Sequence, residues 1–355
     1  MRALTRLAPY LCRLGRIGGV TLVALLMLGG CQRAATPEYL AGDTMGTTYH
    51  VTVTALPRGV SRAAVQAVID DELADVDAHL STYRPDSEIS RFNANPTAEW
   101  VPAAEPLYAV LAEAQRVGGE SGGAFDVTVA PLVSLWGFGE AGPVAPREPT
   151  AAQIEAALAT VGYGKLELRP SPRAVRKQVP GLRVDVAGIA PGYAVDRIAE
   201  RLAGLGVRSC LVEIGGEVRA WGRSPQQRPW RVAVEEPVAG ERRPYALVDL
   251  DGMSISTSGD YRDYRIVGAR RISHTIDPRR GEPVRHDLAS VSVLQRSAMS
   301  ADAYATALMV LGPEEGFRFA QRHHLAALFL ERVTGSESWR ERVTPEFSRL
   351  RRPLP

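Results

Sequence analysis

Residues 299–311 read MSADAYATALMVL, and this stretch organises the interpretation of the rest of the chain. Its alanines, leucine and methionine favour a helix that Ser300 would cap and that Gly312-Pro313 would end. Asp302 and Thr306 are four residues apart, so their oxygens would lie on one face, one turn apart. Such a pair can supply two ligands to Mg²⁺, which prefers oxygen. Two explanations need no metal: a first-turn carboxylate favours the helix dipole, and threonine is common in partly buried helices.

The first 31 residues have the composition of an export signal. Arginines precede an apolar run at 17–28 that is too short to span a bilayer as a mature helix. The run ends in Leu28-Gly29-Gly30-Cys31, which resembles the cleavage box of bacterial lipoproteins, with Cys31 as the lipid-bearing residue. An uncleaved anchor or a plain signal peptide is the alternative. We expect a protein anchored by lipid at Cys31 on the periplasmic side of a bacterial membrane, and Gln32 favours the outer membrane by resemblance to bacterial sorting rules.

Composition narrows the class of protein. The 355 residues carry 42 Lys and Arg against 40 Asp and Glu, so the net charge of +2 gives no electrostatic reason to expect nucleic acid as a partner. Once Cys12 is removed and Cys31 is lipidated, Cys210 is the remaining cysteine, and its apolar surroundings predict a buried strand residue. We therefore expect neither a structural disulfide nor a zinc cluster.

We expect a tether at 32–42, one folded domain at 43–333 and a polar, Arg-rich tail at 334–355 that is loosely held. The polar stretch 81–93 is predicted to be a loop, and residues 183–196 a strand, a glycine-containing turn and a helix start. Other helices are predicted at 61–80, 106–118, 150–160 and 314–323. Other strands are predicted at 47–54, 207–214, 218–221, 230–235, 245–250, 254–258, 288–294 and 325–330. Many strands follow one another between 207 and 294, which favours an α+β fold over a doubly wound sheet.

Eight motifs together resemble the ApbE family of Mg²⁺-dependent flavin transferases, in the order in which that family has them. They are TMGT at 44–47, STYR at 81–84 with FN at 92–93, GAFD at 123–126 with PL at 131–132 and WGFG at 136–139, DVAGIAPGYAVD at 185–196, EIGGE at 213–217, STSGDY at 256–261, SHTIDP at 273–278, and the helix at 299–311. The resemblance implies a two-lobed α+β fold with FAD in the cleft between the lobes. It also implies transfer of FMN from FAD to a Ser or Thr hydroxyl of a partner protein, with release of AMP.

The resemblance also assigns roles to residues at matching positions. A Mg²⁺ ion would be held by the Gly188 carbonyl together with Asp302 and Thr306, and His274 would be the general base for the incoming hydroxyl. Pro191 departs from the family, because that position often carries lysine or another polar residue that contacts FAD, and proline has no side-chain donor. The remaining residues expected to contact FAD are Met45, Tyr83, Ala124, Phe125, Asp126, Ala194 and Ile276.

Two other functions remain open at this level. The same metal site would serve an FAD pyrophosphatase that releases free FMN and AMP. A non-enzymatic, exported flavin-binding lipoprotein is the third hypothesis, and Pro191 is the feature that favours it. For His274 alone, a strand-end histidine satisfied by backbone is the alternative to a catalytic base. The acceptor that the resemblance implies is an exported or membrane redox protein.

Overall fold

The computed structural model describes residues 36–139, 148–240, 242–261, 264–267, 270–336 and 338–354. From Pro37 onward the chain forms one compact unit. Within the described ranges, every helix is too short or too polar to cross a membrane.

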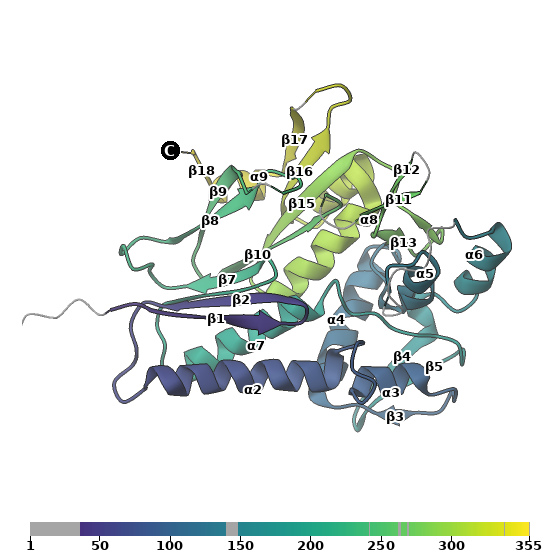
Figure 1. Ribbon diagram of the computed structural model, residues 1–355, viewed down its shortest axis with the longest axis horizontal. Helices are drawn as coiled ribbons and strands as arrows, with labels where there is room; N and C mark the ends of the chain where they lie inside the picture. Colours follow the sequence, from purple (N-terminus) through teal and green to yellow (C-terminus); the bar gives the residue numbers. More distant parts are fainter. Residues whose placement is uncertain are drawn as a thin grey trace, which may run out of the picture. The chain divides into compact units, whose positions relative to one another are not determined.

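Strands from both ends of the chain pair into one antiparallel sheet (Figure 1). Their spatial order is β1-β2-β6-β7-β10-β15-β16-β17, so the first hairpin lies at one edge and β17 at the other. The bounds are β1 Glu38–Thr44, β2 Thr47–Val53, β6 Cys210–Ile214, β7 Glu217–Trp221, β10 Met253–Gly259, β15 Leu288–Gln295, β16 Ala326–Arg332 and β17 Trp339–Val343. The alternation in β2 buries Tyr49, Val51 and Val53, as the sequence predicts.

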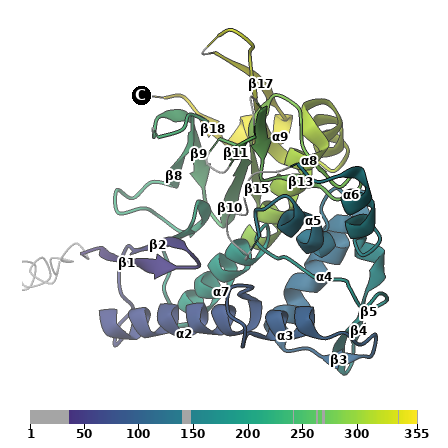
Figure 2. The same ribbon diagram turned by 45° about the vertical axis from the view of Figure 1, so that its right-hand side comes forward.

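Two helices cover one face of this sheet. Helix α7 packs on β6 and β7, α8 packs on β10 and β15, and the two helices contact each other. Helix α2 lies outside α7, and α4 contacts α8, so the main core is enclosed between helices and sheet (Figures 1 and 2). The helix bounds are α2 Arg62–Leu80, α3 Glu88–Ala94, α4 Glu105–Glu120, α5 Ala130–Leu135, α6 Ala151–Leu158, α7 Ala190–Gly204 and α8 Ala298–Arg322.

Smaller sheets complete the two sides of the molecule. A three-stranded sheet, β18-β9-β8, and helix α9 enclose a second core against the other face of the large sheet. Their bounds are β8 Trp230–Glu235, β9 Pro244–Leu250, β18 Arg351–Arg352 and α9 Pro345–Leu350. The strands β3, β5 and β4 pair beside α4. The remaining bounds are β3 Val101–Pro102, β4 Leu166–Pro170, β5 Arg173–Lys177, β11 Tyr264–Val267, β12 Arg270–Ser273, β13 Ile276–Asp277, β14 Glu282–Pro283, and the 3₁₀ helices η1 Val127–Val129 and η2 Tyr163–Lys165.

Several local predictions are confirmed. Ser61 caps α2 by accepting a hydrogen bond from the Ala64 N–H at 3.1 Å. Thr150 and Gln153 form a capping box at the start of α6. Cys210 is fully buried in β6, where burial raises the pKa of its thiol.

The first turn of α8 differs from the prediction. Ser297, not Ser300, is the N-cap, and its hydroxyl accepts from the Ser300 N–H at 3.1 Å. Because α8 begins at Ala298, Asp302 lies in the second turn, and the first turn carries no acidic residue. The helix-dipole explanation for Asp302 therefore loses its basis. Gly312 interrupts the helical geometry with φ 78°, as expected for a break before Pro313.

Two segments between the predicted elements are also corrected. Residues 81–93 are not loop throughout, because Ser87 caps the short helix α3 and accepts from the Ser90 N–H at 3.1 Å. Residues 183–187 form no strand. The side chain of Asn93 holds this segment instead, since it accepts from the Val184 N–H at 2.7 Å and donates to the Val184 carbonyl at 2.8 Å.

The predicted tether and the predicted C-terminal tail both contain regular secondary structure. Residues 38–42, predicted as part of a tether, belong to β1 and pair with β2. The predicted polar tail contains β17, α9 and β18, and Arg351 pairs with Val248 of β9. Phe347 in α9 is fully buried in the second core. The tail was predicted to be loosely held because its composition is polar, but one buried aromatic side chain attaches it to the core.

Replacing Phe347 with alanine tests the role of the C-terminal segment. We expect a loss of about 3–5 kcal/mol in the free energy of unfolding, because a buried aromatic side chain leaves a cavity when truncated. Urea denaturation followed by circular dichroism measures this loss. Leu354, 44% exposed, is the control, and its alanine variant should match the parent. Equal stability of the Phe347→Ala protein and the parent would show that the segment is loosely held after all.

Candidate functional site

A cavity of about 400 Å³ has two main walls. One wall is formed by α8 and the neighbouring sheet, and the other by the segment that contains η1 and α5. Strands β7 and β10, the turn around Gly188 and the segment around β13 also contribute to its wall. It collects most of the predicted site residues from positions far apart in the sequence. Those on its wall are Tyr83, Ala124, Phe125, Asp126, Gly188, His274, Ile276, Asp302 and Thr306.

Helix α8 presents Asp302 and Thr306 at one end of this cavity. The Asp302 side chain is buried, and one of its carboxylate oxygens accepts from the Gly192 N–H at 3.2 Å. The Thr306 hydroxyl is 3.3 Å from that of Ser258 in β10. A Cβ atom added to Gly188 would lie 2.9 Å from the Thr306 hydroxyl oxygen, so only glycine allows this close approach. The predicted set of carboxylate, hydroxyl and glycine backbone is therefore assembled in space.

A second carboxylate, that of Glu217 at the start of β7, lies in the same part of the cavity. Glu217 is 9% exposed, and its carboxylate accepts from the Ser256 hydroxyl at 3.2 Å. Burial, followed by repulsion from Glu217, raises the pKa of Asp302 well above its ordinary value, and burial likewise raises the pKa of Glu217. Among the described residues, no Lys or Arg forms an ion pair with either carboxylate. A bound cation would supply the missing positive charge.

These oxygen donors fit Mg²⁺ better than zinc. Mg²⁺ is commonly held by one or two carboxylates, with its remaining positions filled by water and substrate phosphate. The described residues contain no group of three or more His, Cys, Asp or Glu side chains arranged to hold a metal. Two carboxylates with hydroxyl and backbone oxygen suit a hard cation that shares its shell with substrate.

His274 lies on the wall of the same cavity, just before the short strand β13. Its ring is partly buried and meets the ring of Phe138 edge-on, with centroids 6.4 Å apart. Ile276, two residues later, is 5% exposed and packs with Leu132 and Val161. The imidazole therefore borders the same space that reaches the oxygen donors of α8.

The opposite wall is mainly apolar and comes from the segment after α4. Ala124 and Phe125 are buried there. The Asp126 side chain caps η1, accepting from the Thr128 N–H at 2.8 Å and the Thr128 hydroxyl at 2.6 Å, and burial raises the pKa of its carboxyl. Tyr83 is 78% exposed, so its ring lies at the mouth of the cavity. An apolar wall with an aromatic residue at its entrance suits a planar ring system.

Three predicted FAD contacts do not line the cavity. Met45 is in the β1–β2 turn with φ 47°, and the neighbouring Thr47 lies against Gly215. Pro191 lies in the first turn of α7, and Ala194 is fully buried in the core. All three residues thus lie near elements that form the site, but none of them lines the cavity.

Sequence reasoning assigned no role to Glu217 or Ser258. The sequence does contain a feature that could have indicated Glu217, because this carboxylate directly follows two adjacent glycines. Both glycines have positive φ in the structure. The spatial pairing with Asp302 was not visible in the sequence, because Glu217 and Asp302 are 85 positions apart.

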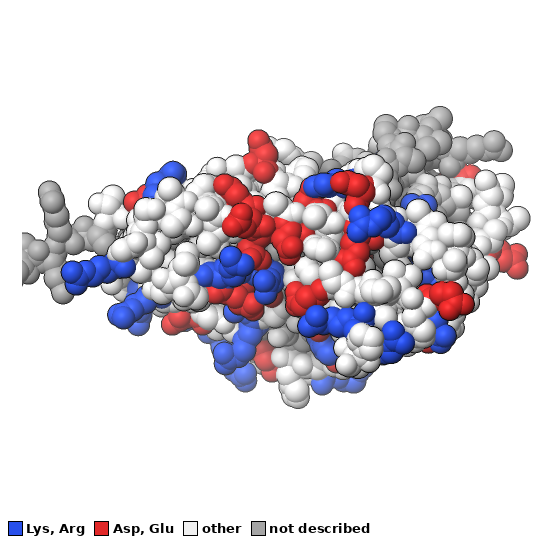
Figure 3. Space-filling model, turned by 90° about the horizontal axis from the view of Figure 1, so that it is seen from below, with Lys and Arg blue, Asp and Glu red and all other residues white. Residues whose placement is uncertain are grey.

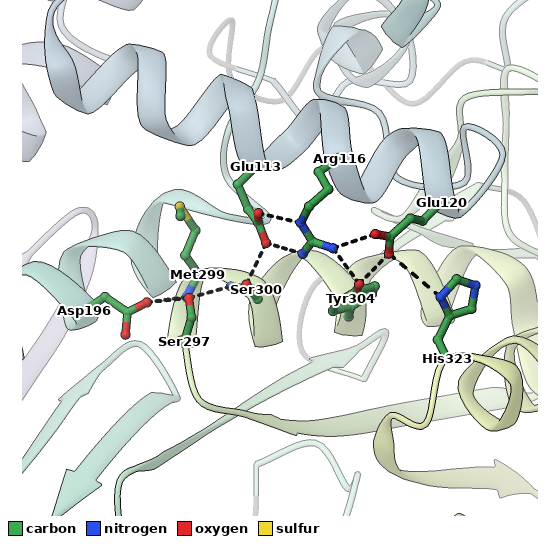
Figure 4. A network of polar contacts seen from close by, with 9 residues as sticks. All are labelled: Glu113, Arg116, Glu120, Asp196, Ser297, Met299, Ser300, Tyr304 and His323. Atoms are coloured by element: carbon green, nitrogen blue, oxygen red, sulfur yellow. Dashed lines mark hydrogen bonds and ion pairs between the residues drawn. The ribbon is translucent and has the colours of Figure 1, made fainter. Parts of the chain in front are cut away.

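The face of α8 opposite the cavity is held by a polar network with α4 (Figure 4). The Ser300 hydroxyl donates to Glu113 at 2.6 Å. The Tyr304 hydroxyl accepts from Arg116 at 2.9 Å and donates to Glu120 at 2.5 Å. Burial opposes ionisation of Glu113, but hydrogen bonds from Arg116 and Ser300 outweigh it and lower the pKa of its carboxyl. Ser300 and Tyr304 thus fix the rotation of α8 that turns Asp302 and Thr306 toward the cavity.

Removing the Tyr304 hydroxyl tests this network. The Tyr304→Phe variant keeps the ring but loses two hydrogen bonds to charged partners, so we expect the free energy of unfolding to fall by about 1.5–3 kcal/mol. The matched control is Tyr39→Phe, since Tyr39 is 65% exposed. That change should stay within about 0.5 kcal/mol of the parent. Chemical denaturation measures both, and equal effects of the two variants would exclude a special role for the network.

The fold and the cavity define an α+β protein in which oxygen donors, a candidate cation site, lie beside a mainly apolar wall. The family model described as "ApbE family" matches residues 45–329. The FAD:protein FMN transferase of Vibrio cholerae is 39% identical over 92% of this chain and 97% of its own, and that of Haemophilus influenzae is 40% identical over 92% and 98%.

Solved structures agree with these sequence matches. The apo flavinyl transferase ApbE of Pseudomonas stutzeri has a TM-score of 0.81 and 41% identity, over 88% of this chain and 96% of its own. The flavin transferase ApbE of Vibrio cholerae has a TM-score of 0.81 and 36% identity, over 89% and 99%. The chain belongs to the ApbE family. The α+β fold and the family predicted from the eight motifs are confirmed.

Proposed function

We propose that this protein is an FAD:protein FMN transferase, which moves FMN from FAD to a Ser or Thr hydroxyl of a partner protein and releases AMP. The activity for which its relatives are named supports this proposal. The observation that carries this proposal is the pair of buried carboxylates, Asp302 and Glu217. Among the described residues neither has a cationic partner, and the pair lies beside Thr306 and Gly188.

In the proposed site, Asp302, Thr306 and the Gly188 carbonyl would hold a Mg²⁺ ion, with Glu217 beside them. When bound, the ion would neutralise negative charge on the diphosphate of FAD, which is the main requirement of phosphoryl transfer. The protein groups orient the rest of the substrate. The apolar wall of Ala124, Phe125 and Ile276 would contact the ring system, and Tyr83 would cover it at the entrance.

His274 would act on the incoming hydroxyl. A Ser or Thr oxygen is a weak nucleophile until a base takes its proton, and imidazole accepts a proton near neutral pH. The oxygen forms a bond to the phosphorus on the FMN side, the phosphorus–oxygen bond to AMP breaks, and the proton moves to His274. The products are a phosphoester-linked FMN on the acceptor and AMP.

The location of the protein is part of the proposal. The apolar segment and Leu28-Gly29-Gly30-Cys31 support a lipid anchor on the periplasmic side of a bacterial membrane. These residues precede the described part of the chain. An acceptor among exported or membrane redox proteins would be reachable from that position.

The activity is tested with FAD, Mg²⁺ and a candidate acceptor, by measuring the FMN-sized gain in acceptor mass and the AMP released. We expect one AMP for each FMN attached. His274→Ala should lower the rate by about 10²–10⁴-fold, as for loss of a general base. The control His324→Ala alters an exposed histidine of the same chain and should leave the rate unchanged.

The outcomes separate the competing functions. Free FMN and AMP formed without acceptor, and no adduct with acceptor, would identify an FAD pyrophosphatase. FAD binding with no product, unaffected by Asp302→Ala and His274→Ala, would identify a flavin-binding lipoprotein.

Gly188→Ala tests the cation site without removing a charged group. The added methyl would lie 2.9 Å from the Thr306 oxygen and should displace it, so Mg²⁺ binding measured by calorimetry should weaken by about ten-fold or more. Gly119→Ala is the matched control, because Gly119 is on the exposed face of α4 and a methyl group added there would have no neighbouring atom within 4 Å. Unchanged binding in Gly188→Ala would remove Gly188 from the site.

A further inference from the structure

One end of the large sheet gathers the start of β1 and three loops. Glu38 pairs with Val53, Val53 pairs with Cys210, and Cys210 pairs with Trp221. The start of β1, the loop after β2, the loop before β6 and the loop after β7 therefore lie at the same end. Hydrogen bonds join the loops, since the Thr54 N–H donates to the Ser209 carbonyl at 3.1 Å and the Thr54 hydroxyl to the Arg223 carbonyl at 2.9 Å.

The charged residues of these three loops are all arginine. The loops 54–61, 204–209 and 222–229 contain Arg58, Arg208, Arg223 and Arg228 and no acidic residue. All four are exposed, and within the described ranges none of them makes an ion pair. We call these four residues the arginine end. Four unpaired guanidinium groups on one surface favour an anionic partner.

Neighbouring charges do not cancel the arginine end. Glu38 is paired with Arg62 at 3.3 Å, and Asp249 is paired with Arg231 at 3.0 Å. Asp251 is exposed and accepts from the Gly222 N–H at 3.2 Å. Its single negative charge does not balance the four arginines. In Figure 3, Lys and Arg predominate at the left-hand end of this face, and Asp and Glu gather nearer its middle.

A cavity of about 260 Å³ opens at the same end. Tyr39, Arg228 and Ser224 are on its wall. The Ser224 side chain is 4% exposed, and its hydroxyl has no hydrogen-bond partner among the described residues. Such a hydroxyl is costly to leave unsatisfied, and together with Arg228 it offers donors to an anion. Tyr39, 65% exposed, is of the residue type enriched where protein meets lipid headgroups.

The chain itself limits how far this end lies from the proposed anchor. Pro37, which precedes β1, follows Cys31 by six positions. A fully extended segment of that length spans at most about 20 Å. A lipid on Cys31 would thus hold the start of β1, and the arginine end beside it, within reach of the membrane surface.

We propose that the arginine end docks on the membrane, where its guanidinium groups bind the phosphates of anionic phospholipids and the Ser224 cavity receives a headgroup. The inference rests on the proposed anchorage at Cys31 and not on flavin transfer. Docking sets the orientation of the domain and leaves the opposite end, with α6, directed away from the bilayer (Figures 1 and 2).

The test uses the full lipidated protein reconstituted in phosphatidylcholine vesicles with or without phosphatidylglycerol. A fluorophore is attached to Gln226→Cys in the loop of the arginine end, or to Glu155→Cys in α6, and its quenching by brominated lipid is measured. The buried Cys210 should not be labelled. We expect quenching at position 226, greater with phosphatidylglycerol and reduced by salt, and none at 155.

Neutralising the arginines should undo the docking. Each basic residue near an anionic surface contributes on the order of five-fold to the docked population. The variant R58Q/R208Q/R223Q/R228Q should therefore lose most of the quenching at 226. The control R173Q/R318Q/R322Q removes exposed arginines elsewhere and should keep it. Flavin transfer in detergent should be the same in both variants.

Two results would overturn the proposal. One is equal quenching at 226 and 155, or none at either position. The other is quenching at 226 that the four-arginine variant and phosphatidylglycerol leave unchanged, which would mean that the tether alone brings the loop to the lipid. A protein that docks as expected but transfers no flavin would contradict only the proposed activity.

Discussion

The site depends on the way in which the start of α7 is held against the start of α8. Asp196 on α7 accepts from the Ser297 hydroxyl at 2.7 Å and from the Ala298 and Met299 N–H groups, and it pairs with Arg219. One carboxylate thus satisfies donors that a helix N-terminus leaves free, and it fixes where α8 begins. Gly192 makes the contact close, because a Cβ there would lie 2.4 Å from the Ala298 carbonyl oxygen.

This contact determines the position of the candidate cation ligands. The Gly192 N–H reaches Asp302 across the same helix pair, and the turn that precedes α7 places Gly188 beside Thr306. On the far face of α8, Ser300 and Tyr304 are tied to α4. The helix is therefore held from both sides, so its inward face cannot rotate without breaking several hydrogen bonds.

Burying two neighbouring carboxylates at this site is electrostatically unfavourable for the fold. Asp302 and Glu217 are both buried, which raises the pKa of each carboxyl, and the charge of Glu217 further disfavours ionisation of Asp302. A fold selected for stability alone would have little reason to keep two such carboxylates without a basic partner. The same arrangement is well suited to an incoming cation, whose charge would replace the repulsion with attraction. The arginine end shows the complementary pattern, with four arginines on three loops that carry no acidic residue of their own.

Much of the local structure was predictable from neighbouring residues alone. Ser61, Thr150 with Gln153, and the alternation in β2 depend on contacts within a turn or along one strand, so their patterns are visible in the sequence. The eight ordered motifs were sufficient for the family and its α+β fold. They were also sufficient to nominate His274, Asp302 and Thr306, which the structure brings to one cavity.

The sequence by itself thus determined the family, most helices and strands, and the spacing that puts Asp302 and Thr306 on one helical face. Only the tertiary structure decided that Asp196 fixes the start of α8, that Glu217 lies beside Asp302, and that Phe347 anchors the C-terminal segment. The reason is that capping by Asp196, repulsion between carboxylates and burial of an aromatic ring each depend on residues from distant parts of the chain. Such contacts leave no periodic trace in the sequence, because they are set by how the elements pack.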